Sequence, residues 1–447
     1  MALSDGSRAT RCRIPVAFVV VLVVSGWLGS ASSAGASIGE EDLVNQYGDA
    51  VIAAASAVRT SVGLEQPEDW DAFLSSPEVL QNLSVAGFPF LDSELLEWGR
   101  RSSFMREIEK VRFLIESEPT FAGAYFDHHQ HGSLVVLTTG DVKEQLARLA
   151  PLMPESSLGL QVLRAERTLV QLQKDAATIV GSEELGREVD LLEVSIDVRS
   201  NSLRFGVRSV SAGAADATEE WLLAAGVKSH AVLYESSVPV PVACFSRDYC
   251  YSPLKAGNRI RSGGTDGALC GMGFHFLLNG NDRQFLTAGH CGSIVSNWSH
   301  LGYGHIGQAT ASLYYNGGHD VLRVQMPDSQ ASHQVIFRST QVNAVNSPWT
   351  GEGICVSRAN TTGFVCGTVS TRYFWYWLGV CTCWLLGGEY TGILIQPGDS
   401  GSPIVWEPDQ RYAVGLISTT GGSAAAPGAY ARIYDVVNSS WNVDFHS

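Results

Sequence analysis

The spacing of hydrophobic residues along the chain changes near residue 250. Before that point, segments with an apolar residue every three or four positions alternate with segments in which every second residue is apolar. The first spacing is typical of amphipathic helices and the second of half-buried strands. Beyond residue 250 the helical spacing nearly vanishes. The chain therefore combines two architectures, a first part (residues 37–251) and a second part (residues 252–447).

The first part is predicted to be a small α+β module. A capping box at the start of 141–151 indicates a short helix that a proline ends, and apolar positions three and four residues apart indicate one longer helix across 162–179. Alternating apolar residues at 192–198 and 203–207, joined by a Ser-Asn-Ser turn, indicate a hairpin.

The second part is predicted to consist of short strands. Its β-rich runs, separated by clusters of Gly, Asn, Asp and Ser, are 273–278, 285–288, 321–324, 364–369, 404–406 and 413–417. Many short strands with turn signals between them indicate an all-β antiparallel sandwich or barrel.

The N-terminus has the features of an export signal. Three arginines precede an apolar run at 14–28, and small residues at 34–36 offer a cleavage point. A membrane anchor is the alternative, but the run of about fifteen residues is shorter than the ~20 that a spanning helix needs. We therefore expect residues 1–36 to be removed and the product to be secreted, without stable membrane insertion.

Charge is distributed unequally between the two parts and argues against one class of partner. The chain has 45 acidic and 30 basic residues, a formal net charge of −15, and residues 1–251 contain 34 of the acidic and 20 of the basic ones. Binding to nucleic acid requires clustered Lys and Arg, which this sequence lacks. We therefore expect no nucleic-acid partner.

Apart from Cys12 in the signal, the cysteines lie in the second part or just before it. They are Cys244, Cys250, Cys270, Cys291, Cys355, Cys366, Cys381 and Cys383. Because the product is expected to be exported, disulfides are favoured over free thiols. A zinc site is disfavoured because the close pair at 381 and 383 is too tightly spaced and has no second pair. We expect no metal and no cofactor.

Three segments of the second part carry residues that suit nucleophilic catalysis. His290 lies in Thr-Ala-Gly-His-Cys after an apolar run, Asp320 in Gly-Gly-His-Asp before another, and Ser400 in the turn Gly-Asp-Ser-Gly-Ser-Pro. Each of these residues alone would be commonplace. Together they place a base, an acid and a nucleophile in the chain order that chymotrypsin-like enzymes use and that subtilisins and α/β-hydrolases do not.

The chemistry explains why these residue types are needed. A serine hydroxyl is a poor nucleophile at neutral pH, so His290 has to take its proton during attack on a carbonyl and return it to the leaving group. Asp320 is expected to hold the imidazole in the required tautomer. The glycines beside Ser400 allow a sharp turn, so we expect the N–H groups of Gly398 and Ser400 to form an oxyanion hole.

At these residues the second part resembles the chymotrypsin-like serine endopeptidases, most closely their secreted bacterial branch of streptogrisins and α-lytic endopeptidase. The resemblance covers roughly residues 252–447. It implies a double six-stranded antiparallel barrel with the three residues in the cleft between the barrels. It also implies a polypeptide substrate and an acyl-enzyme intermediate.

The same resemblance implies further roles. It implies disulfides between Cys270 and Cys291 and between Cys355 and Cys366, while the pairing of the other four cysteines stays open. It also implies that Ser418 hydrogen-bonds the acid, in a strand that binds the substrate backbone. The segments that form the specificity pocket in this family offer no free carboxylate here, so we expect an uncharged residue before the cleaved bond.

Residues 37–251 resemble, in less detail, the propeptides of this branch, which assist folding and then block the cleft. A disulfide-bonded barrel built from non-local strand pairs folds slowly, so a folding template has a use. We therefore expect a zymogen in which the acidic first part is both folding aid and inhibitor of the domain at 252–447. The cut is expected between Cys250 and Gly263.

Other interpretations attach to three features. The barrel could be a catalytically silent binding module, whereas an esterase is disfavoured because the serine motif lacks the second glycine of Gly-x-Ser-x-Gly. Asp127 and the histidines at 128, 129 and 131 could suggest a metal site, which their expected position in a loop disfavours. The aromatic run at 374–386 is expected to form a hairpin that packs on the barrel, rather than an exposed contact surface.

Overall fold

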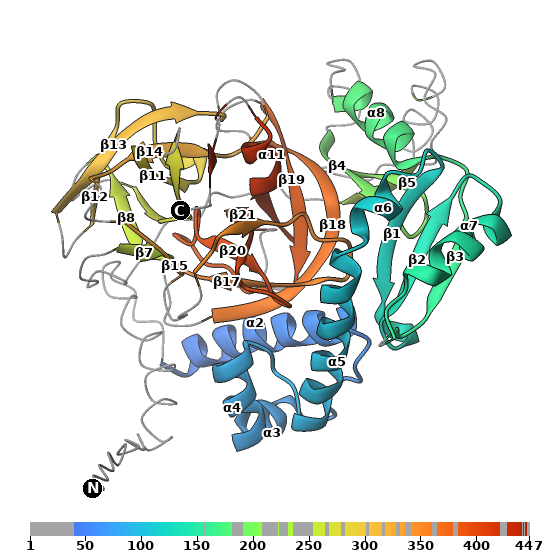
Figure 1. The fold of residues 1–447 in the computed structure, drawn as a ribbon. Coiled ribbons are helices and arrows are strands. Elements are labelled where there is room, and N and C mark those ends of the chain that lie inside the picture. The colour runs from blue at the N-terminus through green and yellow to red at the C-terminus, as the bar shows by residue number, and fades with distance from the viewer. Residues whose placement is uncertain are drawn as a thin grey trace, which may run out of the picture. The chain divides into compact units, whose positions relative to one another are not determined.

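The first part of the chain begins with a group of helices (Figure 1). They are α2 (Glu40–Ser61), α3 (Trp70–Ser75), α4 (Pro77–Ala86), α5 (Asp92–Glu109) and α6 (Arg112–Glu116). The side chains of Asp69 and Ser76 accept backbone hydrogen bonds that cap α3 and α4, and Gly87 ends α4 in a left-handed conformation with φ 81°. Local capping residues therefore set where α3 and α4 begin and where α4 ends.

The computed structural model describes most of the chain from residue 40 onward. Described are residues 40–155, 157–180, 191–207, 222, 231–235, 254–263, 268–278, 282–300, 304–314, 318–327, 331–335, 341–359, 364–378, 383–420, 427–439, 441 and 443–444. The expected signal at 1–36 lies outside them, as do Cys244, Cys250 and Cys381. Among these residues no helix has both the length and the apolar character needed to cross a membrane. The contacts described below lie within one compact unit, Val44–Ser447.

A three-stranded sheet follows the helices in the order β1-β2-β3. Its elements and the helices near it are β1 (Phe121–Asp127), β2 (Ser133–Thr138), α7 (Val142–Leu149), β3 (Leu160–Arg164) and α8 (Leu169–Val180). The single helix expected across 162–179 is wrong in its first part, because Val162 lies in β3, parallel to β2. The apolar residues around Val162 fit the spacing of a helix as well as that of a strand. The hydrogen bonds that β2 offers stabilise the strand.

The second part contains two large sheets whose neighbouring strands are mostly antiparallel, which confirms the expected all-β architecture. The first sheet has the order β23-β10-β11-β14-β13-β12-β8-β9. Its strands are β8 (Arg259–Ser262), β9 (Leu269–Gly271), β10 (His275–Leu278), β11 (Asp282–Thr287), β12 (Asn297–His300), β13 (Gly304–Ser312), β14 (Leu322–Gln325) and β23 (Val443–Asp444). Phe285, Trp298 and Val324 belong to the buried apolar cluster that this sheet encloses.

The second sheet closes into a barrel. Its strands run β17-β20-β21-β22-β19-β18, and an additional pairing of β17 with β18 joins the two ends. They are β17 (Gly353–Ser357), β18 (Phe364–Leu378), β19 (Cys383–Thr391), β20 (Pro403–Trp406), β21 (Tyr412–Thr419) and β22 (Gly428–Arg432). The aromatic run forms the expected hairpin of β18 and β19, with Phe374 and Tyr376 buried.

Shorter elements and two disulfides complete the second part. The elements are β7 (Leu254–Ala256), η3 (Gly289–Cys291), β15 (Ala331–Val335), β16 (Ala344–Val345) and α11 (Ile433–Val437). In the first part, η1 (His128–Gln130) and η2 (Ala150–Leu152) follow β1 and α7. Both expected disulfides form, Cys270–Cys291 and Cys355–Cys366, and the second joins residues directly opposite each other on β17 and β18.

A hairpin of the first part continues the sheet of the closed barrel. Its strands are β4 (Leu191–Asp197) and β5 (Ser202–Val207), as expected, and β6 (Ala231–Glu235) is added parallel to β5. β4 pairs with β18 at Phe374–Tyr376, whereas β17 pairs only with Phe364–Thr368 (Figure 1). An uncovered strand edge exposes unpaired backbone groups. β4 supplies partners for the part of the β18 edge that β17 does not reach.

Buried charges also join the two parts. Arg112 of α6 donates to the carboxylate of Glu352, which has no exposed surface. Glu116 accepts hydrogen bonds from Arg372 of β18 at 2.5 Å and from the indole N–H of Trp349 at 2.6 Å. Removing one partner of a buried ion pair leaves an uncompensated charge. These ion pairs therefore strongly favour contact between the two parts over their separation.

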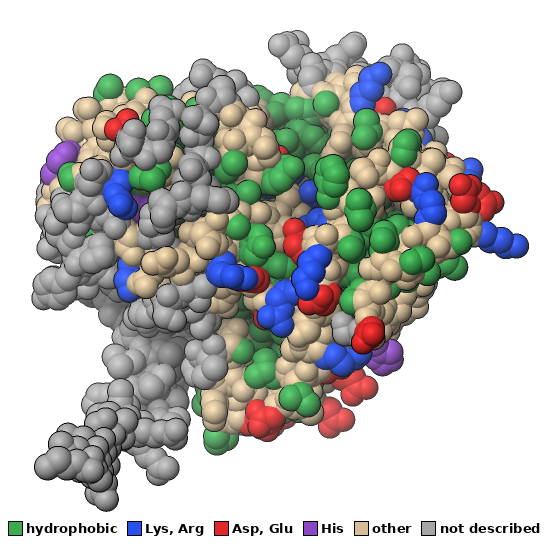
Figure 2. Space-filling view, viewed as in Figure 1, with side chains coloured by type: hydrophobic (Ala, Val, Ile, Leu, Met, Phe, Trp, Pro, Cys, Tyr) green, Lys and Arg blue, Asp and Glu red, His purple; other side chains and the backbone are tan. Residues whose placement is uncertain are grey.

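Glu389 of β19 is a further acid buried beside the first part. On the face shown in Figure 2, Asp and Glu side chains gather mainly over the acidic first part. Glu389 is only 4% exposed. Burial raises its pKa from 4.5 to about 7, the charge of Arg204 opposes this, and those of Glu193 and Asp197 add to it.

Replacing this acid should change how stability depends on pH. A carboxyl group with a raised pKa in the folded state contributes stability that is complete below its ordinary value of 4.5 and is lost as the pH rises through about 7. We predict that Glu389→Gln raises the free energy of unfolding at about pH 8 by roughly 1–3 kcal/mol, and that the gain disappears near pH 4.5. Urea unfolding at several pH values measures this, with exposed Glu155→Gln as the control. A gain that does not depend on pH would contradict the prediction.

Candidate active site

Strand pairing brings His290 and Asp320 together. β11 and β14 are antiparallel neighbours, with Thr287 opposite Leu322. The residues that follow β11 therefore meet the residues that precede β14. His290 lies in the short turn η3 just after β11, and Asp320 lies two residues before β14. The two side chains are thus neighbours because of the register of one strand pair.

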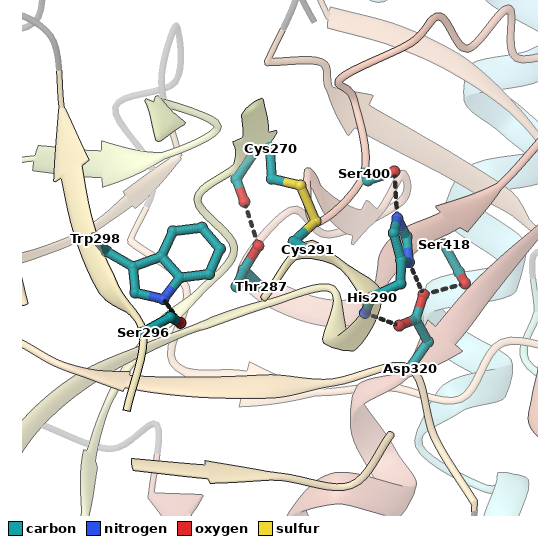
Figure 3. Close-up of a disulfide and its surroundings, with 10 residues drawn as sticks. Cys270, Thr287, His290, Cys291, Ser296, Trp298, Asp320, Ser400 and Ser418 are labelled. Atoms are coloured by element: carbon teal, nitrogen blue, oxygen red, sulfur yellow. Dashed lines mark hydrogen bonds and ion pairs between the residues drawn. A yellow bond between two sulfur atoms is a disulfide. The ribbon is translucent and has the colours of Figure 1, made fainter. Parts of the chain in front are cut away.

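Asp320 contacts His290 through both carboxylate oxygens (Figure 3). The backbone N–H of His290 donates to Oδ1 at 2.8 Å, and ring atom Nδ1 lies 2.7 Å from Oδ2. A carboxylate only accepts hydrogen bonds, so Nδ1 carries the proton and Nε2 presents a lone pair. Nε2 lies 3.0 Å from Oγ of Ser400. The imidazole is therefore arranged to accept the hydroxyl proton of Ser400.

Asp320 has no exposed surface, yet its surroundings favour the ionised form. Burial by itself would raise its pKa. The charge of His290, together with hydrogen bonds from its ring, from Ser418 and from the His290 backbone, outweighs burial and lowers the pKa below its ordinary value. A buried carboxylate that stays ionised can stabilise a protonated imidazole beside it.

Ser400 lies in a turn held by strands of both sheets. Gly398 and Gly401 flank it with φ 97° and 83°, a conformation that glycine adopts without steric cost. The carbonyl of Ser400 accepts from the N–H of Gly271 at 2.6 Å, and the N–H of Gly401 donates to the carbonyl of Ile417 at 2.7 Å. Gly271 belongs to the first sheet and Ile417 to the second, so the serine is fixed where the two sheets meet.

The space around Gly401 makes a direct prediction. A Cβ added there would lie 2.3 Å from Oγ1 of Thr287 and 2.5 Å from the carbonyl oxygen of Gly271, so backbone would have to move. Gly263 has a similar φ of 77° but nothing within 4 Å of its Cβ position, which makes Gly263→Ala the matched control.

We predict that Gly401→Ala lowers the free energy of unfolding by about 2–4 kcal/mol, since strain in the left-handed region and a clash act together. Gly263→Ala should lose only about 1 kcal/mol, from the backbone conformation alone. Urea unfolding of both variants tests this, and equal losses would contradict it.

Ser418 of β21 lies against Asp320, as the sequence predicted. Its hydroxyl donates to Oδ2 of Asp320 and accepts from the phenol of Tyr376 at 2.7 Å. All three side chains are fully buried. The position of Tyr376 was missed, because in the sequence it is one of several aromatic residues in a hairpin and only closure of the barrel brings its hydroxyl to Ser418.

Leu386 of β19 holds the segment before Asp320 in place. The N–H of Leu386 donates to the carbonyl of Gly318 at 2.7 Å, and Nδ1 of His319 lies 3.1 Å from the carbonyl oxygen of Leu386. Burial lowers the pKa of His319. His319 therefore forms a hydrogen bond that anchors the loop before Asp320.

His128 is likewise a structural residue. Its Nε2 lies 2.6 Å from the carbonyl oxygen of Gly351, so it joins the first part to the second. Burial lowers its pKa to about 4. Among the residues that the structure describes, no three His, Cys, Asp or Glu side chains group in a way that could hold a metal ion.

Fold and site together define a class of protein. Two antiparallel sheets, one closed as a barrel, meet at a turn that carries a serine, and the serine is linked by hydrogen bonds to a histidine and a buried aspartate. The three residues occur along the chain in the order His, Asp, Ser. These features resemble those of the chymotrypsin-like serine protease family.

Comparison with known proteins identifies a relative within that family. No family model matches the chain. Streptogrisin-A from Streptomyces griseus is 28% identical over 174 residues, a match that covers 39% of this chain and 54% of streptogrisin-A. The chain thus spans about half the length of that curated relative. The chain is related to the bacterial chymotrypsin-like serine proteases of which streptogrisin-A is a member.

Three solved protease structures match part of the chain. Nocardiopsis protease (NAPase) is 24% identical, with a TM-score of 0.36, and the match covers 43% of this chain and 99% of that one. A glutamic acid specific serine protease is 22% identical with a TM-score of 0.36, covering 43% and 99%. Thermobifida fusca Protease A is 22% identical with a TM-score of 0.36, covering 43% and 97%.

Proposed function

We propose that this chain is the precursor of a secreted serine endopeptidase that hydrolyses peptide bonds through His290, Asp320 and Ser400. The observation that carries the proposal is the unbroken line of hydrogen bonds from Asp320 through the imidazole to the serine hydroxyl, ending at 3.0 Å between Nε2 and Oγ. A binding module would have no need to keep an ionised carboxylate buried for this purpose. The proposal requires no metal or cofactor.

The geometry suits attack by Ser400 on a substrate carbonyl. As Oγ forms a bond to the carbonyl carbon, Nε2 of His290 takes the hydroxyl proton and Asp320 stabilises the imidazolium. The carbonyl oxygen becomes an oxyanion, for which we propose the N–H groups of Gly398 and Ser400 as donors. The tetrahedral intermediate then breaks its C–N bond, and His290 gives the proton to the leaving amine. Water repeats the sequence on the acyl-enzyme.

Replacing the nucleophile tests this directly. We predict that Ser400→Ala lowers peptide hydrolysis by at least ~10⁴-fold and abolishes covalent labelling by a fluorophosphonate, because only binding and the oxyanion donors remain. Exposed Ser293→Ala, close to His290 in sequence, should keep both. Both proteins are labelled after the first part has been cut away. Labelling of the cut wild type and not of cut Ser400→Ala supports the endopeptidase, whereas a cut wild type that stays unlabelled would favour a silent binding module.

We further propose that the first part is a propeptide that assists folding and inhibits the second part. Its support is physical: β4 completes an open edge of the barrel, and Arg112 and Glu116 pair with buried charges of the second part. The nucleophile Ser400 is fully buried in this chain, which is what a latent enzyme needs. Secretion with removal of residues 1–36, and a cut between Cys250 and Gly263, remain part of this proposal.

The preference for an uncharged residue before the cleaved bond is also proposed. Arg432 is the basic residue closest in sequence to the expected pocket segments. It is 3% exposed, pairs with Asp435 at 3.2 Å, and lies over the ring of Tyr373 at 4.5 Å. These contacts occupy its charge, so it is poorly placed to attract an acidic substrate residue.

The folding role can be tested with separated pieces. Residues 252–447 expressed alone should give little activity, and refolding them with residues 37–251 should restore it. The rescue should be weakened at least ~10-fold by Arg112→Met, because Glu352 then loses its buried partner. Lys110→Met is the control, since the Lys110 side chain is 67% exposed and pairs only at the surface. Full activity without residues 37–251 would reduce the first part to an accessory domain.

A further inference from the structure

A buried phenol completes the hydrogen bonds that surround Asp320. Tyr376 of β18 donates to Oγ of Ser418 at 2.7 Å, and the Ser418 hydroxyl in turn donates to Oδ2 of Asp320. The same oxygen lies 2.7 Å from Nδ1 of His290. One line of hydrogen bonds thus runs from Tyr376 to the proposed nucleophile, Ser400, and its five side chains come from five separate segments of the chain.

The phenol determines which way the Ser418 proton points. A hydroxyl has a single proton to donate, so Ser418 cannot serve Tyr376 and Asp320 at once. Burial raises the pKa of Tyr376 well above its ordinary value, and the charge of Asp320 acts in the same direction. The phenol therefore stays protonated and remains a donor. The Ser418 proton is left for Asp320, and successive bonds of such a chain strengthen one another by ~10–30%.

Packing holds the phenol in place. Tyr376 stacks on Phe374 with ring centroids 5.6 Å apart and an interplanar angle of 17°. It lies in a buried apolar cluster with Tyr314 and Leu385. Its backbone is paired on both sides, opposite Leu385 of β19 and Glu193 of β4. A hydroxyl fixed in this way can orient its neighbour at little entropic cost.

We propose that Tyr376 is a positioning residue of the active site. By donating to Ser418 it directs the hydrogen bond that Ser418 gives to Asp320, and so controls how much of the Asp320 charge is left for His290. This role rests on the proposed function of the site. Tyr376 acts through Ser418 and Asp320, and its effect should therefore appear in the rate of the chemical step rather than in substrate binding.

Tyr376→Phe removes the hydroxyl and keeps the ring. The bond from Ser418 to Asp320 then weakens. Asp320 therefore holds the proton of His290 more tightly, and the carboxylate is less well aligned with the imidazole. We expect kcat to fall about 2–5-fold with KM unchanged, the size of a fraction of a net hydrogen bond. The acid limb of the plot of kcat/KM against pH should move to higher pH by a few tenths of a unit.

A double-mutant cycle tests whether Tyr376 acts through Ser418. If it does, Tyr376→Phe combined with Ser418→Ala should have the kcat of Ser418→Ala alone. Losses that add would overturn the proposal, because they would show two independent effects. Tyr412→Phe, at the start of the strand that carries Ser418, is the control for loss of a tyrosine hydroxyl and should keep the wild-type kcat.

A second variant separates positioning from simple destabilisation and does not depend on the folding of Tyr376→Phe. Site-specific incorporation of 3-fluorotyrosine at position 376 keeps the hydroxyl and makes it a stronger donor. The acid limb should then move to lower pH, opposite to Tyr376→Phe, and a shift to higher pH or no shift would overturn the proposal. Fluorophosphonate labelling of the wild type keeps the two claims apart. A wild type that stays unlabelled after the first part has been cut away would overturn the proposed function and this role with it, whereas a labelled enzyme with additive losses would overturn this role alone.

Discussion

The negative charge of Asp320 is the constraint around which the second part is built. An ionised carboxylate without exposed surface is tolerated only where hydrogen bonds and an opposite charge compensate for lost hydration. Here the compensation comes from the backbone and ring of His290 and from the hydroxyl of Ser418. These donors reach Asp320 from two segments, the turn that carries His290 and the strand β21. The charge can therefore be buried only when both sheets are formed and correctly in register.

The same requirement explains why the site lies between the sheets. His290 and Asp320 come from the first sheet through the pairing of β11 with β14, whereas Ser418 comes from the closed barrel. The turn that carries Ser400 is bonded to both sheets, through Gly271 and Ile417. Neither sheet alone holds all the groups. A small shift of one sheet relative to the other would thus disrupt the hydrogen bonds of the site before it disrupted the packing of either core.

The sequence pointed to the side chains that meet at the candidate site more clearly than it predicted the architecture of the first part. His290, Asp320 and Ser400 were recognisable because each sits in a short motif with flanking glycine or proline, and the two disulfides followed from the family resemblance. Helices α2–α6 were not predicted individually, and Val162 was assigned to a helix although it lies in β3. A short element such as β3, with five residues, is decided by partners distant in sequence. Tyr376 was missed for the same reason, since nothing local distinguishes it from the other aromatic residues of β18.

Contacts between the two parts bear on the proposed removal of the first part, because they determine what the second part would lose. Arg112 and Glu116 of the first part pair with Glu352 and Arg372 of the second, which would lose these partners if the first part were removed. The two charges left behind are of opposite sign, and the charge of Glu352 already acts on Arg372. They can therefore compensate each other in part, which limits the cost of separation. By contrast, no other described strand can pair with the edge of β18 that β4 would vacate. Loss of the backbone pairing between β4 and β18 would therefore destabilise the separated barrel more than loss of the ion pairs.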